Sequence, residues 1–216
     1  MEKLYPKSKV EIKGFTARHY DTLLDMITFG GYSSFIRKVI YLMEIKSTDR
    51  IIDLGSGTGR NACLMMKYIS TDGKLIGLDI SEEMGKQFEK RCIEFPNAKF
   101  VHRRIDVPLP YVEEFDKAFI SFVLHGFPQD VREVIIENAF RSLKKNGKFF
   151  ILDYNEFSVK DMPLYLKIPF KLFECHYAFD FIRRDWKKVL IEKGFENFEE
   201  RLFFKEYVRL IRVTKI

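Results

Sequence analysis

The 216-residue chain lacks the features that would place it outside the cell or across a membrane. It has only three cysteines, an odd number spaced far apart, which predicts reduced thiols rather than a disulfide framework. No apolar run approaches the ~18 residues of a membrane span, and the opening MEKLYPKSKVEIKG lacks the apolar centre of a signal peptide. Glutamine occurs only at Gln87 and Gln129, a scarcity typical of hyperthermophile proteins. These absences predict a cytoplasmic protein.

Charge is plentiful but unevenly placed, with 37 Lys and Arg against 31 Asp and Glu, or net +6. Residues 1–18 hold five basic and two acidic groups (+3), and residues 183–216 hold ten and six (+4). The central part holds 22 and 23 (−1). Because the excess lies at the two ends, it fits solubility or peripheral contact with an anionic membrane surface better than nucleic acid along the core.

Buried strand patterns alternate with helical patterns from Arg50 onward. Strands are expected at 50–55, 74–79, 99–102, 115–121 and 148–153, and helices at 60–69, 82–93, 129–143 and 183–193. Short connections between them predict a mostly parallel α/β sheet with helices on both faces. Strand patterns at 198–204 and 207–214 are separated by a short turn, which predicts a closing antiparallel pair.

Two segments fall outside this alternation, although we expect one domain over residues 1–216. Residues 1–46 predict an N-terminal helical cap, with two helical patterns divided at 29–32 and a helix cap at Ser33. Residues 154–182 are rich in Phe, Tyr and Leu without a clean period. Since they follow the fifth strand, they predict a lid over an apolar pocket; a packed helical excursion is the alternative.

The first strand runs into a glycine turn with glycines at Gly55, Gly57 and Gly59. A dinucleotide fingerprint would need its third glycine one position later, where Arg60 stands. Asp53, two residues before the turn, would repel a pyrophosphate but would pair with an ammonium group. The turn therefore favours S-adenosylmethionine, which carries an ammonium and no phosphate.

Further carboxylates follow the next two strands of the pattern. Asp79 ends the second strand, the position from which a carboxylate accepts hydrogen bonds from both ribose hydroxyls. Asp106 follows the third strand and is expected to accept from an adenine amino group, with Val107 and Ile80 against the ring faces. Any one of these carboxylates alone is better explained as a solvated strand end, but their order at consecutive strand ends indicates a nucleoside site.

These motifs resemble the class I S-adenosylmethionine-dependent methyltransferases, and most the ubiquinone/menaquinone-biosynthesis C-methyltransferases. The similar stretches are Ala17-Arg-His-Tyr-Asp21, Asp53-Leu-Gly-Ser-Gly-Thr-Gly, Ile120-Ser-Phe and Leu143-Lys-Lys-Asn-Gly-Lys. The resemblance implies a Rossmann-like seven-stranded sheet whose last strand is antiparallel. It also implies that Thr58 and Ser121 contact the cofactor and that Tyr20 closes over it.

The resemblance is weaker where the methyl acceptor would bind, because that family commonly has an Arg-Asn pair where this chain has Leu124-His125-Gly126. Methyl transfer requires close approach, exclusion of water and often a general base. His125, after the fourth strand, is a candidate base, with a loop-capping histidine as the alternative. Tyr154 could orient a substrate oxygen, and His176 in the Glu174–His176 cluster is a second candidate base.

We expect a small aromatic or apolar acceptor, because the segment after the fifth strand is rich in aromatic side chains. We expect no metal, because the three adjacent residues Glu174, Cys175 and His176 cannot all face one ion. A nucleic-acid methyltransferase is the alternative suggested by the positive charge and by the pairs Arg103-Arg104 and Arg183-Arg184. The balanced core and the sequence Ser121-Phe-Val-Leu, where such enzymes carry an Asn-Pro-Pro-Tyr-like tetrad, disfavour it. A non-catalytic partner subunit is disfavoured by the intact glycine turn.

Overall fold

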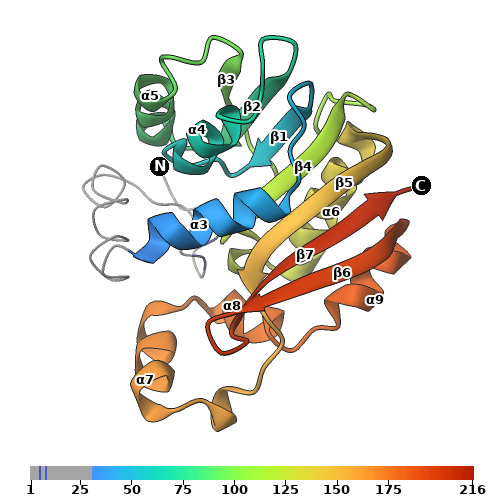
Figure 1. Ribbon diagram of the computed structural model, residues 1–216. Coiled ribbons are helices and arrows are strands. Elements are labelled where there is room, and N and C mark those ends of the chain that lie inside the picture. Colours follow the sequence, from blue (N-terminus) through green and yellow to red (C-terminus); the bar gives the residue numbers. More distant parts are fainter. Residues whose placement is uncertain (1–4, 6–7, 9–30) are drawn as a thin grey trace.

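A computed structural model of the chain describes Tyr5, Ser8 and residues 31–216. Its centre is a seven-stranded sheet in the order β3-β2-β1-β4-β5-β7-β6 (Figure 1). The strands are β1 (Arg50–Leu54), β2 (Lys74–Asp79), β3 (Ala98–His102), β4 (Phe115–Ser121), β5 (Leu143–Tyr154), β6 (Phe195–Phe203) and β7 (Val208–Lys215). Strands β1 to β5 pair in parallel, whereas β7 is antiparallel to both β5 and β6. The predicted Rossmann-like sheet is confirmed.

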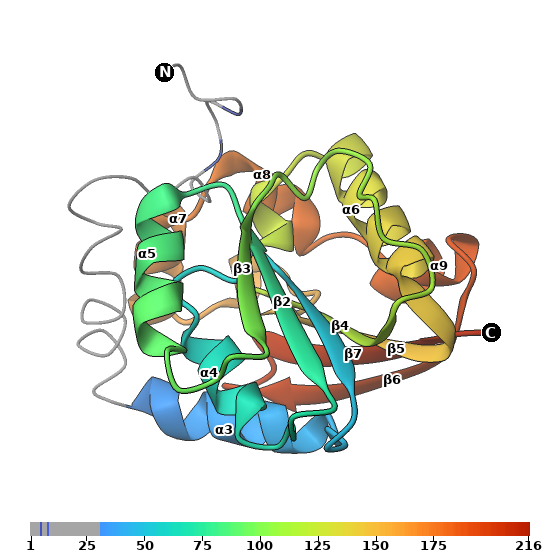
Figure 2. The same ribbon diagram turned by 90° about the horizontal axis from the view of Figure 1, so that it is seen from above.

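Helices cover both faces of the sheet (Figure 2). One face carries α3 (Gly31–Leu42), α4 (Arg60–Met66) and α5 (Glu82–Arg91); the other carries α6 (Gln129–Ser142), α8 (His176–Phe181) and α9 (Trp186–Glu192). Neighbouring strand residues divide between the two buried clusters, Ile51 facing the first group and Ile52 the second. This burial on both sides explains why the strands read as continuous apolar runs. None of the helices in the described ranges has the length and apolarity of a membrane span.

The structure differs from the predicted boundaries most at β5. The predicted helix ends at 143 and the predicted strand begins at 148, with the turn residues Asn146 and Gly147 between them, but β5 already begins at Leu143, which pairs with Phe115 of β4. A register shift between Phe115 and Lys117 takes up the extra residues, and Asn146 adopts a left-handed φ of 64°. The start of β5 is therefore set by pairing with β4 and not by the turn residues Asn146 and Gly147.

The N-terminal helical cap is tested only in part. Its first helical pattern, together with Tyr20, lies outside the described residues. The second is α3, which begins at Gly31, so Ser33 lies inside the helix and does not cap it. The Ser33 hydroxyl instead accepts a hydrogen bond from Arg60 (2.5 Å), which joins α3 to the start of α4.

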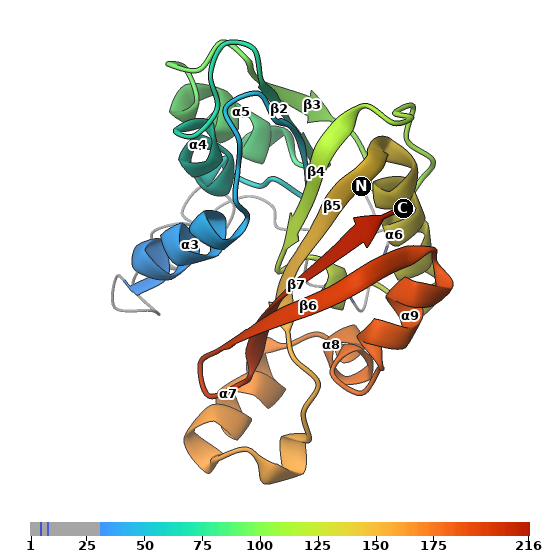
Figure 3. The same ribbon diagram turned by 45° about the vertical axis from the view of Figure 1, so that its right-hand side comes forward.

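The segment after β5 forms η2 (Val159–Asp161), α7 (Leu164–Phe173) and α8. Arg132, fully buried in α6, donates to the Asp180 carboxylate (2.6 Å) and to the Tyr177 carbonyl (2.7 Å). These bonds fix α8 against the body of the protein. Helix α7, in contrast, projects beyond α8 (Figure 3).

The expectation of three reduced thiols is wrong. Cys63 of α4 and Cys92, directly after α5, form a disulfide with their Cα atoms 5.5 Å apart, while Cys175 is free and buried. Helices α4 and α5 follow neighbouring parallel strands and lie on the same face of the sheet, which brings the two thiols together. An odd cysteine count and long spacing could not reveal this, because the proximity arises from tertiary structure.

The disulfide leads to a prediction about stability. Thiol titration of the denatured, unreduced protein should find one reactive thiol, Cys175. In the chain-entropy model, closing a loop of 29 residues stabilises the fold by about 3–4 kcal/mol, so a reductant should lower the melting temperature. The Cys63→Ser/Cys92→Ser variant should melt at the same temperature with and without reductant. Three titratable thiols in the wild type would contradict the disulfide.

Candidate active site

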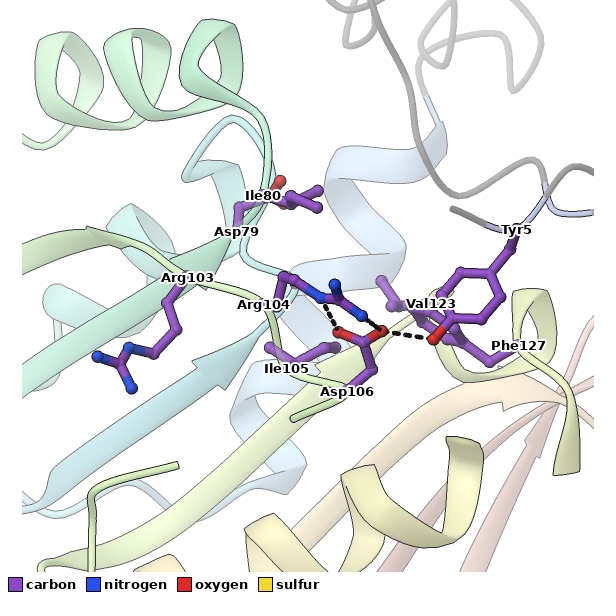
Figure 4. A pocket seen from close by; sticks show the side chains of 10 residues that line it. Tyr5, Asp79, Ile80, Arg103, Arg104, Ile105, Asp106, Val123 and Phe127 are labelled. Carbon is purple, nitrogen blue, oxygen red and sulfur yellow. Dashed lines mark hydrogen bonds and ion pairs between the residues drawn. The ribbon is translucent and has the colours of Figure 1, made fainter. Parts of the chain in front are cut away.

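A pocket lies where the parallel strands end (Figure 4). Its lining comes from Tyr5 and from the residues that follow β1, β2, β3 and β4, namely Gly55, Asp79, Ile80, Arg103, Arg104, Ile105, Asp106, Val123 and Phe127. Carboxyl ends of parallel strands are where open α/β sheets bind ligands. The pocket thus joins four of the predicted cofactor residues, Gly55, Asp79, Ile80 and Asp106.

The glycine turn presents bare backbone at this edge. The amides of Gly55 and Ser56 both donate to the Leu78 carbonyl of β2 (2.8 and 2.9 Å), which folds the turn over the neighbouring strand. Gly57 adopts a φ of 53°, and no atom lies within 4 Å of the position that its Cβ would occupy. A ligand can therefore approach the main chain at Gly57 closely.

Asp53 is a buried carboxylate, and one of its oxygens has no hydrogen-bond partner in the described part of the chain. Its side chain is at the end of β1 and the residue is 2% exposed. Among the described residues its Oδ2 has no hydrogen-bond partner, and the buried hydroxyls of Ser56 and Ser121 lack one as well. Burial, and secondarily the charge of Asp79, raise the pKa of Asp53 to about 8. A ligand ammonium would satisfy this carboxylate and ionise it.

Asp79 is held in place by the backbone. Its two carboxylate oxygens accept from the amides of Gly57 (2.9 Å) and Ser81 (2.9 Å). Burial raises the pKa of Asp79 above its ordinary value despite these hydrogen bonds. Each oxygen accepts only one of these bonds, so both retain acceptor capacity for ligand hydroxyls.

Asp106 faces the pocket, as predicted, but its carboxylate already has partners. Arg104 donates to it in a two-pronged arrangement (2.9 and 2.7 Å), and the Tyr5 hydroxyl donates at 2.5 Å (Figure 4). Burial alone would raise the pKa of Asp106, but the hydrogen bonds from Arg104 and Tyr5 outweigh it and lower that pKa. Burial and Asp106 raise the pKa of Tyr5 to about 12, so this phenol remains a donor.

The apolar side of the pocket differs from the prediction. Val107 does not line it; the Val107 carbonyl accepts from Asn138 (2.7 Å) in α6. Ile105, on the other side of Asp106, lines the pocket instead, together with Val123. The sequence predicted an apolar residue next to Asp106, but both of its neighbours are apolar, so the sequence could not show which of them lines the pocket.

Thr58 is buried within the glycine turn, and its hydroxyl accepts from Arg91 of α5 (2.9 Å). Gly59 also faces α5, because a Cβ there would lie 2.7 Å from the Phe88 ring. These two predicted cofactor residues thus anchor the turn to α5.

His125 lies in η1 (Leu124–Gly126), just after β4 and close to the pocket residue Val123. Its Nδ1 donates to Asp153 Oδ1 (2.8 Å), which leaves the Nε2 lone pair of the neutral ring free to accept a proton. Asp153, fully buried in β5, also accepts from the amides of His125 (3.1 Å) and Tyr154 (2.8 Å). The sequence analysis did not single out Asp153, although a carboxylate at the end of the fifth predicted strand could have indicated a site residue.

Glu174, between α7 and α8, completes this cluster. The Tyr154 hydroxyl donates to Glu174 Oε1 (2.5 Å), and Glu174 Oε2 lies 3.6 Å from His125 Nε2. Burial opposes a charged imidazole, but Asp153 and Glu174 outweigh it and raise the pKa of His125. His176 is exposed at the start of α8, with its ring against Tyr177, and does not join the cluster. In the described part of the chain, no group of His, Cys, Asp and Glu side chains is arranged to hold a metal ion.

Comparison with known proteins gives this geometry a context. Residues 7–182 match the model of the ubiE/COQ5 methyltransferase family. A demethylmenaquinone methyltransferase of Staphylococcus carnosus is 27% identical over 204 residues, covering 86% of this chain and 83% of that protein. A ubiquinone/menaquinone biosynthesis C-methyltransferase of Francisella tularensis subsp. novicida is 27% identical over 207 residues, covering 85% and 81%.

Solved structures share the fold at lower sequence identity. A SAM-dependent methyltransferase of Aquifex aeolicus superposes with a TM-score of 0.62 at 16% identity, covering 84% of this chain and 89% of that one. A TehB-like methyltransferase of Corynebacterium glutamicum gives 0.64 at 16% identity, covering 93% and 98%. With most of its length matched by the family model, and with the glycine turn and carboxylates described above, the chain belongs to the ubiE/COQ5 methyltransferase family and is an S-adenosylmethionine-dependent methyltransferase.

Proposed function

We propose that this enzyme methylates a ring carbon of a small, quinol-type aromatic acceptor and that His125 is its general base. The observation that carries the proposal is the buried Asp153–His125 pair beside the pocket, with Nε2 left free to accept a proton. The names of the relatives support a quinone-type acceptor. The accepting atom and the roles of individual residues are our inference.

In this proposal the cofactor is bound by three carboxylates at the strand ends, by the bare backbone of the glycine turn and by apolar side chains of the pocket. Asp53 pairs with the ammonium group and Asp79 accepts from the ribose hydroxyls, while Gly57 allows close approach. Ile80 and Ile105 flank the adenine, and Asp106 accepts from its amino group, with Tyr5 beside it. The bound cofactor supplies a methyl group on a sulfonium, which is open to in-line displacement.

Ser121, with its buried hydroxyl, is proposed as a further cofactor contact, and Tyr20 as a residue that closes the site. Thr58 and Gly59 support the turn from the side of α5. Of the predicted residues, Val107 has the weakest case, because Ile105 lines the pocket instead.

The acceptor would lie against the aromatic side chains that follow β5. Phe170 of α7 packs edge-on against Tyr154 (5.3 Å between ring centres), Phe157 (5.6 Å) and Phe179 (5.4 Å). Such a surface excludes water and suits an apolar ring. We propose that α7 is the lid of this site, whereas α8 is held by Arg132.

His125 would then complete the reaction. When the ring carbon accepts the methyl group, the proton on that carbon passes to His125 Nε2, which restores the aromatic ring. Asp153 orients the imidazole, and Glu174, 3.6 Å from Nε2, stabilises the imidazolium that forms. Tyr154 donates to Glu174 and so positions it.

The nucleic-acid alternative gains no support from the two arginine pairs. Arg104 is bound by Asp106, and Arg184 donates to Asp180 through two nitrogens (2.8 and 2.9 Å). One member of each pair is therefore held by a carboxylate of the protein itself. The names of the relatives reported above refer to demethylmenaquinone and to ubiquinone/menaquinone biosynthesis, and not to nucleic acid.

One prediction from this proposal concerns Asp53→Asn. Loss of a charge-assisted contact, worth about 1.5–3 kcal/mol, should weaken S-adenosylmethionine binding about 10- to 100-fold in calorimetry. Because the pKa of Asp53 is about 8 in the free protein, cofactor affinity of the wild type should rise as the pH increases from 6 to 8. The affinity of Asp53→Asn should change less than that of the wild type over that range, and the remaining change is expected from Asp79, whose pKa burial also raises.

Stability provides the control for this variant. The pKa of Asp53 is higher in the folded protein (about 8) than in the unfolded chain (about 4). Such a group lowers the stability of the protein progressively as the pH rises from the unfolded pKa to the folded pKa. Asp53→Asn should therefore melt no lower than the wild type at pH 7, and the exposed Asp72→Asn should change neither property. Unaltered cofactor binding by Asp53→Asn, or a large loss of its stability, would assign Asp53 a structural role.

A further prediction concerns His125, the proposed general base. His125→Ala should lower kcat about 10²- to 10⁴-fold, the usual contribution of a general base, with cofactor affinity unchanged. Asp153→Asn removes the charge that raises the pKa of His125, so the acidic limb of the kcat profile should move to lower pH and kcat should fall. His176→Ala should retain the wild-type kcat. Full turnover by His125→Ala would exclude His125 as the base.

A further inference from the structure

Helix α7 exposes an apolar stripe that faces away from the active site. Leu164, Tyr165, Ile168 and Leu172 are 69%, 63%, 56% and 67% exposed. At 100° per residue these four positions fall within about 100° of the helix circumference. Phe170, which lies on the opposite side of the helix, is buried against the aromatic surface described above. The stripe is therefore separate from the acceptor pocket.

Lysines border this stripe. Lys167 and Lys171 lie along one flank of α7, and Lys205, in the turn between β6 and β7, reaches Tyr165 on the other flank (3.1 Å from Nζ to the phenol oxygen). Lys160, just before α7, joins the same edge, since its carbonyl accepts from Lys167 Nζ (2.7 Å). Residues 158–173 contain three lysines and a single acid, Asp161. The surroundings of the stripe are therefore positively charged.

We propose that α7 docks on the surface of a bilayer that contains anionic lipids, with the apolar stripe inserted among the headgroups. An exposed apolar face rimmed by lysines is the pattern of helices that lie in the membrane interface, where lysines pair with anionic headgroups. A second copy of the chain suits the surface less well. In a two-fold dimer, which presents the same patch on both sides, the bordering lysines would face one another.

Docking through α7 would also place the active site next to the membrane. The inner face of the same helix contacts Tyr154, and Glu174 at its end lies beside His125. An apolar ring acceptor dissolved in the bilayer would then reach the pocket without crossing water. This consequence rests on the proposed function, but the docking itself does not.

The test measures sedimentation of the full-length protein with phosphatidylcholine vesicles, with and without phosphatidylglycerol. The wild type should bind the anionic vesicles and lose that binding at high salt. Leu164→Glu/Ile168→Glu should bind at least tenfold more weakly. The control Ile93→Glu/Val112→Glu adds the same charge at two exposed apolar residues (79% and 58%) outside α7 and should bind like the wild type.

Two measurements make the outcome unambiguous. The Leu164→Glu/Ile168→Glu variant should retain calorimetric binding of S-adenosylmethionine and the wild-type melting temperature, which separates a loss of docking from a loss of folding. Equal vesicle binding by this variant and the wild type would overturn the proposal. So would wild-type binding that does not depend on phosphatidylglycerol, or a dimer in sedimentation velocity that this variant abolishes.

Discussion

The central constraint in this structure is the desolvation of Asp53. Strand β1 lies between β2 and β4, and Asp53 is level with Gly77 on one side and Phe119 on the other, so the sheet removes it from water. A carboxylate in that position is unfavourable unless it is protonated or paired with a cation. The fold therefore holds a carboxyl group that is stable when it is protonated or when a cation pairs with it, and in our proposal the cofactor ammonium is that cation.

The carboxyl edge of the sheet divides into two chemically different halves. Asp53, Asp79 and Asp106 follow β1, β2 and β3 and make one half acidic, which suits a cationic nucleoside. His125 and Asp153, at the ends of β4 and β5, make the other half suitable for removing a proton. Val123 joins the halves, because a Cβ at Gly55 would lie 2.8 Å from its Cγ2 and because it precedes His125 by two residues. In the proposed mechanism, cofactor binding and proton transfer therefore use adjacent strand ends.

The local sequence pattern was enough to predict the helices and strands, but it could not predict which distant residues contact one another. The bounds of β2 and β4 match the predicted strands residue for residue, since burial on both faces leaves a continuous apolar run. The start of β5 at Leu143 and the Asp153–His125 bond depend on partners 28 residues away, and so did the Cys63–Cys92 pair, 29 residues apart. Sequence spacing carries little information about such contacts. Glu174, and not His176, lies beside His125, and this too depends on how the chain turns between α7 and α8.

The aromatic richness of residues 154–182 illustrates the same limit in a single helix. Composition suggested that these side chains gather around a pocket, yet α7 directs Phe170 inward and Tyr165 outward. With 3.6 residues per turn, an almost wholly apolar helix must present apolar side chains on every side, and a single pocket can cover only one of them. The proline inside the helix, Pro169, did not prevent it from forming. The outward side of α7 is therefore the part of the segment that the acceptor site cannot cover, and it is the part to which we assign the membrane contact.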